Sequence, residues 1–177
     1  MRGCQSRQRA KGADGERTGH RVVLRPLSDE DLCVVASWYE KGRDLPRRLE
    51  EAKVEPTACL LAVSLGEGDR PIGVVEYRVG VPEDGWLGFR SVAVEPGLRG
   101  LGLDSEAVRL VEDDALGRGL ARRFWAGVHP DNGLGVYFWL RLGYRPVRAD
   151  EATWPGSSTQ DAMSMIRMSE RPKLRDG

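Results

Sequence analysis

Apolar and polar residues alternate along this chain with two different periods, which predicts a mixture of strands and helices. Between short apolar runs lie segments in which apolar residues recur every three or four positions, as on one face of a helix. The runs with strand character include Cys59–Leu65, Ile72–Val79, Val92–Val94, Arg122–Val128 and Ala162–Met168. The predicted order is a strand, two helices, three strands, a helix, a strand, a helix and two strands.

Local signals mark the first two helices. Ser28 and Asp31 have the spacing of a capping box, which predicts a helix that begins after Ser28. The apolar residues that follow at helical spacing are Leu32, Val35 and Trp38. A glycine and a proline interrupt this pattern, and a short second helix is predicted over Arg47–Lys53.

A glycine-containing turn joins the strand at Val92–Val94 to the helix that follows it. Pro96 ends the strand, and Gly100 and Gly102 allow a tight turn whose backbone can approach a ligand closely. Helical spacing begins directly afterwards. A helix N-terminus carries unpaired N–H groups and about half a positive charge, which stabilises an anion. Because Arg99 adds a cation, the segment predicts a phosphate-binding site.

Two glycines two positions apart also fit an ordinary strand-to-helix turn, so the surrounding residues have to decide. The dinucleotide-binding fingerprint would need a third glycine at Ser105 and an acidic residue near Leu120, and neither is present. The Walker pattern would need a lysine followed by serine or threonine after the last glycine, which is also missing. Neither of these nucleotide-binding motifs fits.

The turn resembles the phosphate loop of the GCN5-related N-acetyltransferases, the GNAT superfamily. In the family pattern R/Q-x-x-G-x-G/A, Arg99 and Gly102 match the first two positions, and Asp104 stands where the family has glycine or alanine. A carboxylate there is bulky and has the same charge as the phosphates. As a helix-start residue it would instead point away from them and stabilise the helix dipole by about 0.3–1 kcal/mol.

A second stretch resembles the same family. The family pattern is N-x-x-A, then an aromatic residue, a basic residue and G-F, and the matching positions are Asn132, Gly135, Trp139, Arg141, Gly143 and Tyr144. The 30 residues from Gly102 to Asn132 suit one helix and one strand. The chain therefore resembles this superfamily over roughly residues 21–169.

The resemblance implies a fold, an activity and a cofactor. The fold would be α+β in three layers, with a mixed, mostly antiparallel central sheet of six to seven strands and about four helices. The activity would be acetyl transfer from acetyl-CoA to a primary amine of a small molecule or a protein N-terminus, with no metal ion. The residues implied to bind the cofactor are Val92, Ala93, Val94, Arg99, Gly100, Leu101, Gly102, Leu103, Asp104, Asn132 and Trp139.

A protonated amine has to lose a proton before it can attack a thioester, so a base is expected. Glu76 interrupts an apolar strand and would share a face with Ile72 and Val74. It is either the base or a solvent-facing residue near a strand end. His129 is the second candidate, because imidazole titrates near neutral pH, or it is an exposed loop residue.

Many relatives of this kind use a tyrosine on the helix after the asparagine to protonate the departing thiolate. Trp139 stands at that position, and indole cannot donate this proton. Tyr137 is the nearest alternative acid, but it lies about 200° away around the helix and could instead have a packing role. A second hypothesis is therefore a non-catalytic acyl-CoA-binding or regulatory module with the same fold.

The acceptor side has two aromatic candidates. In this family the segment between the first two strands usually covers the acceptor, so Trp38 and Tyr39 are interpreted either as substrate-binding residues or as the buried face of the first helix.

Composition agrees with one domain, expected at residues 21–170 between a disordered basic tail (1–20) and a flexible C-terminus (171–177). The chain has 177 residues, 40% of them hydrophobic, and no apolar run long enough to cross a membrane. Its three cysteines have neither metal-ligand spacing nor an even count, which predicts reduced thiols in the cytoplasm.

The formal net charge is zero but unevenly distributed. Residues 1–25 contain seven basic and two acidic residues, so the remainder has 20 basic and 25 acidic residues and a net charge of about −5. Such a surface favours a cationic amine and not a nucleic acid. The expected partner is therefore an amine acceptor, with neither nucleic acid nor membrane, and a homodimer is left open.

Overall fold

The computed structural model describes residues 17–38, 45–66, 68–147 and 162–169. The chain divides into two compact units. The first contains residues up to Tyr77 together with Ser91–Leu110, and the second contains Arg78–Arg90 and the residues from Val111 onward. Two strands and one helix are divided between the units.

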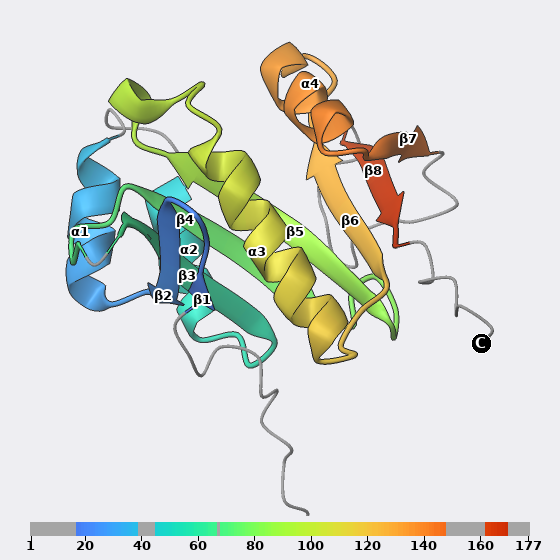
Figure 1. The fold of residues 1–177 in the computed structure, drawn as a ribbon, viewed down its shortest axis with the longest axis horizontal. Coiled ribbons are helices and arrows are strands. Elements are labelled where there is room, and N and C mark those ends of the chain that lie inside the picture. The colour runs from blue at the N-terminus through green and yellow to red at the C-terminus, as the bar shows by residue number, and fades with distance from the viewer. Residues whose placement is uncertain (1–16, 39–44, 67, 148–161, 170–177) are drawn as a thin grey trace, which may run out of the picture. The chain divides into compact units, whose positions relative to one another are not determined.

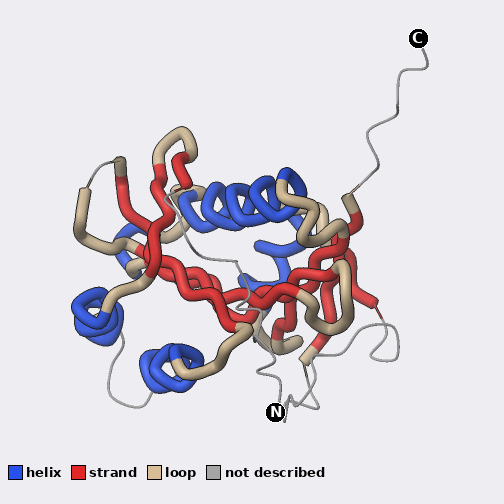
Figure 2. The backbone as a smooth tube through the Cα atoms, turned by 90° about the horizontal axis from the view of Figure 1, so that it is seen from below, coloured by secondary structure: helices blue, strands red, loops and turns tan. Residues whose placement is uncertain are grey.

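The first unit is built on one end of the sheet. Neighbouring strands follow in the order β1 (Arg17–Thr18), β2 (Val22–Pro26), β3 (Ala58–Leu65), β4 (Gly73–Val79) and β5 (Trp86–Val94), of which β4 and β5 belong only in part to this unit. The pairs β1–β2 and β2–β3 are antiparallel. Figure 2 shows helices α1 (Asp29–Ser37) and α2 (Leu45–Lys53) on the side of these strands opposite to α3 (Leu103–Gly117).

Apolar residues of α1 and α2 form a core against β4. Leu32, Val35 and Leu49 pack with Val74 in this cluster. The predicted capping box is present at the start of α1, where Ser28 Oγ accepts the Asp31 N–H at 3.2 Å and the Asp31 carboxylate accepts the Ser28 N–H at 2.8 Å.

The second unit contains the remaining strand pairs. Strand β5 pairs in parallel with β6 (Arg123–Val128), β6 pairs antiparallel with β8 (Met163–Met168), and β8 pairs antiparallel with β7 (Arg145–Val147). Helix α4 (Gly133–Arg141) lies between β6 and β7 in the chain, and Figure 1 shows β7 and β8 side by side. The buried indoles of Trp86 and Trp125 form a small apolar cluster in this unit.

The predicted fold class is confirmed, because antiparallel pairs and the parallel β5–β6 pair make a mixed open sheet, and the described residues form four α-helices. Two predicted boundaries are wrong. The second helix begins at Leu45, with Pro46 in its first turn, where proline is tolerated because its missing N–H would have no helical partner. The strand before the glycine turn begins at Trp86 rather than near Val92.

The N-terminal boundary is also different. Arg17 and Thr18 lie in the segment predicted as a disordered tail, but they form a strand that pairs with Leu24 and Val23. Ordered structure therefore precedes residue 21. The Gly19 N–H donates to Val22 O at 2.8 Å and turns the chain back, which the polar sequence around it did not indicate. Residues 1–16 and 170–177 lie outside the described part of the chain.

Candidate functional site

The glycine turn of the first unit has the conformation that its sequence predicts. A short 3₁₀ helix (Pro96–Leu98) follows β5, and α3 begins at Leu103. Gly100 and Gly102 have φ angles of +79° and +76°, in the left-handed region that residues with a Cβ seldom adopt. Both glycines are therefore required for this path of the backbone from strand to helix.

The turn presents free backbone donors at the start of α3. In the described part of the chain, the N–H groups of Leu103 and Asp104 have no hydrogen-bond acceptor, as expected for the first turn of a helix. The side chain of Leu103 is buried, whereas that of Leu101 is exposed. Val94 is buried at the end of the preceding strand, and Val92 and Ala93 are half-buried. A backbone of this kind fits the pyrophosphate of a nucleotide cofactor.

The predicted cation Arg99 is directed back towards the strand, since its Nε donates to Val94 O at 3.3 Å. A second cation, Arg21, holds the turn from the start of β2. Its Nη1 donates to Leu101 O at 2.9 Å, and its Nε donates to Glu106 in the first turn of α3 at 3.0 Å. Sequence reasoning missed Arg21, because 80 residues separate it from Leu101 and no local pattern connects them.

Glu106 fastens β2 to α3. Its Oε1 accepts the backbone N–H groups of Arg21 at 2.6 Å and of Val22 at 3.2 Å. Burial raises the pKa of Glu106, but these N–H groups and the Arg21 guanidinium outweigh that effect and lower the pKa below its usual value. Glu106 thus stays ionised close to the proposed phosphate site, and its negative charge is compensated by the Arg21 guanidinium.

Asp104 stands where the family pattern has glycine or alanine, and it lies in the first turn of α3. Its Oδ1 accepts the Ser105 N–H at 2.7 Å and is 3.4 Å from Ser105 Oγ. This is the helix-start role considered from the sequence. The same contact occupies one N–H of the first helical turn.

Glu76 lies in the middle of β4 and is fully buried. Ser91 Oγ donates to Glu76 Oε2 at 2.8 Å, and Arg48 Nη2 of α2 donates to Ser91 Oγ at 2.7 Å. The solvent-facing interpretation of Glu76 is therefore wrong. The physical reason is tertiary, since β4 lies between β3 and β5 and α2 covers this side chain's face of the sheet.

Trp38 caps the C-terminus of α1 and packs against the core cluster that includes Leu49 and Val74. This fits the buried face of the first helix. Its indole N–H is nevertheless buried, and no described residue accepts a hydrogen bond from it. Tyr39 lies outside the described residues.

In the second unit, Asn132 caps α4. Its Oδ1 accepts the Gly135 N–H at 3.0 Å. A Cβ at Gly135 would lie 2.6 Å from Asn132 Nδ2 and 2.9 Å from Val128 Cγ2, so an alanine does not fit. The departure from alanine in the family pattern therefore has a structural cause.

Trp139 belongs to the core of the second unit. It is 7% exposed, and its ring centroid lies 5.6 Å from that of Phe89 and 4.7 Å from that of Tyr144. Tyr137 is 59% exposed, with the Arg141 guanidinium 5.8 Å from its ring centroid. The two side chains therefore lie in different surroundings, as the rotation between them predicts.

His129 follows β6 as an exposed loop residue. Its Nδ1 accepts the Asp131 N–H at 3.3 Å and lies 3.7 Å from an Asp131 carboxylate oxygen. No contact with another candidate residue is found for it among the described residues.

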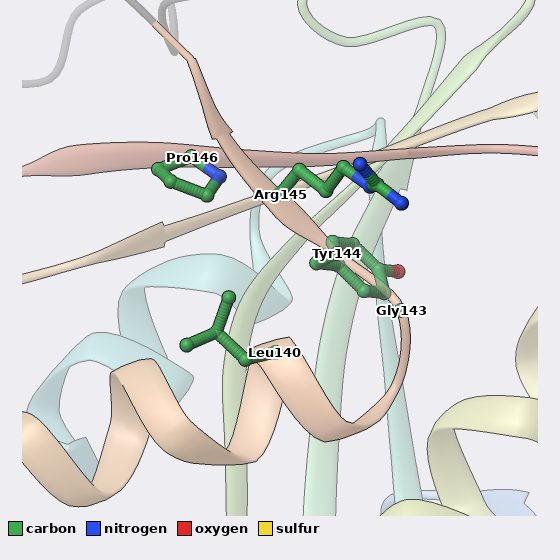
Figure 3. Close-up of a pocket in the computed structure, with 5 residues that line it drawn as sticks. All are labelled: Leu140, Gly143, Tyr144, Arg145 and Pro146. Carbon is green, nitrogen blue, oxygen red and sulfur yellow. The ribbon is translucent and has the colours of Figure 1, made fainter.

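An open depression of about 550 Å³ lies at the end of α4 (Figure 3). Its lining residues are Leu140, Gly143, Tyr144, Arg145 and Pro146. None of the predicted site residues lines it, so this depression does not extend the candidate site.

The predicted residues are thus divided between the units. The first unit contains Trp38, Glu76, Val92–Val94 and Arg99–Asp104, and the second contains the others, His129, Asn132, Tyr137 and Trp139. The residues that sequence reasoning missed, Arg21, Arg48 and Ser91, all belong to the first unit. Their sequence neighbourhoods give no signal, because each acts through a contact distant in the chain.

Comparison with known proteins decides the family. The family model described as the acetyltransferase (GNAT) family matches residues 25–144. The chain belongs to the GNAT family. It is accordingly an acyltransferase by family, and its sheet and helices agree with solved GNAT structures.

Solved structures share the fold of this GNAT protein. An acetyltransferase from Agrobacterium tumefaciens has a TM-score of 0.70 at 18% identity, covering 88% of this chain and 95% of the other. One from Thermus thermophilus has a TM-score of 0.64 at 21% identity, covering 84% and 97%.

A more distant structure comes from Salmonella typhimurium, an acetyl transferase that modifies the N-terminal serine of the 50S ribosomal subunit protein L7/L12. It has a TM-score of 0.66 at 12% identity, covering 86% of this GNAT protein and 97% of its own chain. A comparison with curated proteins found no match. No helix in the described ranges is long and apolar enough to span a membrane.

Proposed function

We propose that this protein transfers an acetyl group from acetyl-CoA to a primary amine. The observation that carries the proposal is the glycine turn, in which the N–H groups of Leu103 and Asp104 have no acceptor among the described residues and Arg21 binds Leu101 O. Donors at a helix N-terminus suit the pyrophosphate of coenzyme A. The extended backbone of Val92–Val94 would receive the pantetheine.

The reaction requires a base on the acceptor side, and we assign that role to Glu76. Bound acetyl-CoA supplies an acetyl group activated as a thioester. Glu76 takes a proton from the acceptor ammonium, which gives the nitrogen a lone pair for attack on the carbonyl carbon. His129 and Tyr137 are less suited, because neither has a contact with another candidate residue among the described residues.

The acceptor is a primary amine on a small molecule or at a protein N-terminus. The net negative charge of the chain after residue 25 supports a cationic acceptor, since opposite charge raises the rate of encounter. The serine-modifying enzyme from Salmonella supports the N-terminal alternative as a related precedent. The free thiols of Cys33 and Cys59 support a location in the reducing cytoplasm.

The experiment has two parts. Isothermal titration calorimetry measures acetyl-CoA binding to the full chain, and release of free thiol is then followed with a panel of amines that contains aminoglycosides, polyamines and peptides with different N-terminal residues. Saturable binding and amine-dependent thiol release are expected. Absence of binding at millimolar acetyl-CoA would refute the proposal.

The second candidate function is a non-catalytic acyl-CoA-binding module, and two observations favour it. Asp104 occupies one N–H of the proposed phosphate site, and Trp139 replaces the usual acid. Binding of acetyl-CoA without thiol release from any amine would support the module. The enzyme hypothesis does not require the missing acid, because holding the two reactants close together contributes much of the rate of acyl transfer.

A further inference from the structure

Three polar side chains from three elements of the first unit form one hydrogen-bonded chain beneath α2. Arg48 Nη2 on α2 donates to Ser91 Oγ on β5 at 2.7 Å, and Ser91 Oγ donates to Glu76 Oε2 on β4 at 2.8 Å. Ser91 is 8% exposed and Glu76 is fully buried. The three residues are distant in the sequence, so only the folded chain brings them together.

The surroundings of this chain are apolar. Val74 and Glu76 are two positions apart on β4, and Ser91 and Ala93 are two positions apart on β5, so the members of each pair share a face. Val74 and Ala93 belong to the apolar cluster that α1 and α2 cover. Burial of a carboxylate there is unfavourable unless donors are aimed at it.

The direction of the hydrogen bonds fixes the orientation of the carboxylate. Ser91 has a single hydroxyl hydrogen, and its use on Glu76 leaves the oxygen lone pairs to accept from Arg48. The Ser91 hydroxyl therefore donates to Glu76 and the Arg48 guanidinium donates to Ser91. Each bond involves a charged group at one end, which makes it stronger than a neutral bond. Ser91 cannot rotate its hydrogen elsewhere without leaving Glu76 Oε2.

We propose that Ser91 and Arg48 are positioning residues for Glu76, a role that rests on the proposed acetyltransferase function. Ser91 fixes Oε2, and Oε1 takes the proton of the acceptor. In that step an N–H bond of the ammonium breaks and an O–H bond forms on Oε1. The amine nitrogen then attacks the carbonyl carbon, and the C–S bond breaks with its electron pair on sulfur.

The protons balance through the remaining steps. After attack the nitrogen still carries one proton in excess of the amide product, and this proton goes to the departing thiolate. Glu76 returns its own proton to solvent. Arg48 and Ser91 neither gain nor lose a proton, so their effect on the rate is through the position of the carboxylate alone.

The test measures kcat and both KM values for the full chain, with kanamycin and a peptide that begins with serine as acceptor probes, followed by thiol release. Ser91→Ala is expected to lower kcat about tenfold, the size of one hydrogen bond to a charged group, and to leave the KM for acetyl-CoA unchanged. Ser91→Thr keeps the hydroxyl and is expected to restore most of kcat. Arg48→Met should resemble Ser91→Ala, and Arg48→Lys should be intermediate.

Two variants in the same unit are matched controls. Ser64 is a buried serine on β3 whose hydroxyl has no hydrogen-bond partner among the described residues, so Ser64→Ala removes a buried hydroxyl without removing a contact. Arg47 precedes Arg48 on α2 and forms an exposed ion pair with Glu51 at 3.8 Å. Both Ser64→Ala and Arg47→Met are expected to keep the wild-type kcat.

A double-mutant cycle separates positioning from a structural role. Glu76→Gln alone should lower kcat by 10²- to 10⁴-fold, as expected for loss of a base. In the Glu76→Gln background, Ser91→Ala should have no further effect, because there is no carboxylate left to position. Thermal unfolding of each variant, followed by circular dichroism, establishes that the compared proteins are folded.

The outcomes distinguish the two levels of the proposal. No acetyl transfer by the wild type would refute the proposed function and this inference with it. Transfer that Glu76→Gln leaves unchanged would refute the base. If Glu76→Gln lowers kcat as expected, but Ser91→Ala has the same effect as Ser64→Ala or lowers kcat equally in both backgrounds, the positioning role alone is refuted.

Discussion

Tyr144 Oη donates a hydrogen bond to Glu112 Oε1 at 2.6 Å, and both side chains are almost completely buried in the second unit. The other Glu112 oxygen is bound by Arg167 of β8. Helix α3, the start of β7 and strand β8 are thereby joined through one carboxylate. Tyr144 is thus a core residue that also satisfies part of a buried charge.

Tyr144→Phe should therefore destabilise the protein by about 1.5–3 kcal/mol, because a buried carboxylate loses one donor while the ring volume stays the same. Urea unfolding measures this difference. Tyr137→Phe is the control, since Tyr137 is exposed and surface changes are usually within about 0.5 kcal/mol. Equal effects of the two substitutions would contradict the role of the Glu112 bond.

Asp104 is expected to weaken cofactor binding. Asp104→Ala removes a negative charge beside the proposed pyrophosphate and releases the Ser105 N–H, so the Kd for acetyl-CoA should fall about three- to tenfold. Isothermal titration calorimetry gives the Kd. Asp104→Asn keeps an acceptor for Ser105 and removes only the charge, so it shows how much of the gain is electrostatic. An unchanged Kd for both variants would show that the carboxylate lies away from the phosphates.

Gly135→Ala should destabilise the protein by about 1–2 kcal/mol, because the new Cβ would displace the Asn132 side chain that caps α4. Gly133 lies in the same helix, and a Cβ there would meet nothing within 4 Å. Gly133→Ala is therefore expected to be neutral or to stabilise the protein by about 0.5–1 kcal/mol. A differential scanning calorimetry comparison in which both variants melt together would contradict this account of the cap.

The lowered pKa of Glu106 predicts that the free energy of unfolding depends on pH. Its pKa in the folded protein lies below the ordinary value of 4.5, so the ionised side chain stabilises the folded state above about pH 4.5 and this contribution is lost as the pH falls through the folded pKa. Glu106→Gln should therefore lower the melting temperature at pH 7, and the difference from wild type should shrink as the pH falls below 4.5.

Glu51→Gln provides the comparison for Glu106, because Glu51 is an exposed helix residue whose ion pair with Arg47 contributes little. The melting temperature of Glu51→Gln should equal that of the wild type at pH 7 and at pH 3.5. A Glu106→Gln difference that is the same at pH 7 and at pH 3.5 would show that the side chain stabilises the protein through packing and not through its charge.

The sequence by itself determined the features that depend on residues close together in the chain. The capping box at Ser28 and Asp31, the positive φ angles of Gly100 and Gly102, and the order of the helices and strands after Arg21 follow from local sterics, hydrogen bonding and apolar periodicity. Two motifs with characteristic spacing were sufficient to indicate the family.

Only the tertiary structure decided the surroundings of the chemically important side chains. Whether Glu76 faces solvent depends on α2. Its partner Ser91 is 15 residues away from it in the chain, and Arg48, which binds Ser91, is 43 residues away from Ser91. Likewise, Arg21 reaches the glycine turn from 80 residues away. Burial and charge pairing arise from elements that pack together after distant segments have folded, and a pattern read along the chain contains no information about which segments these will be.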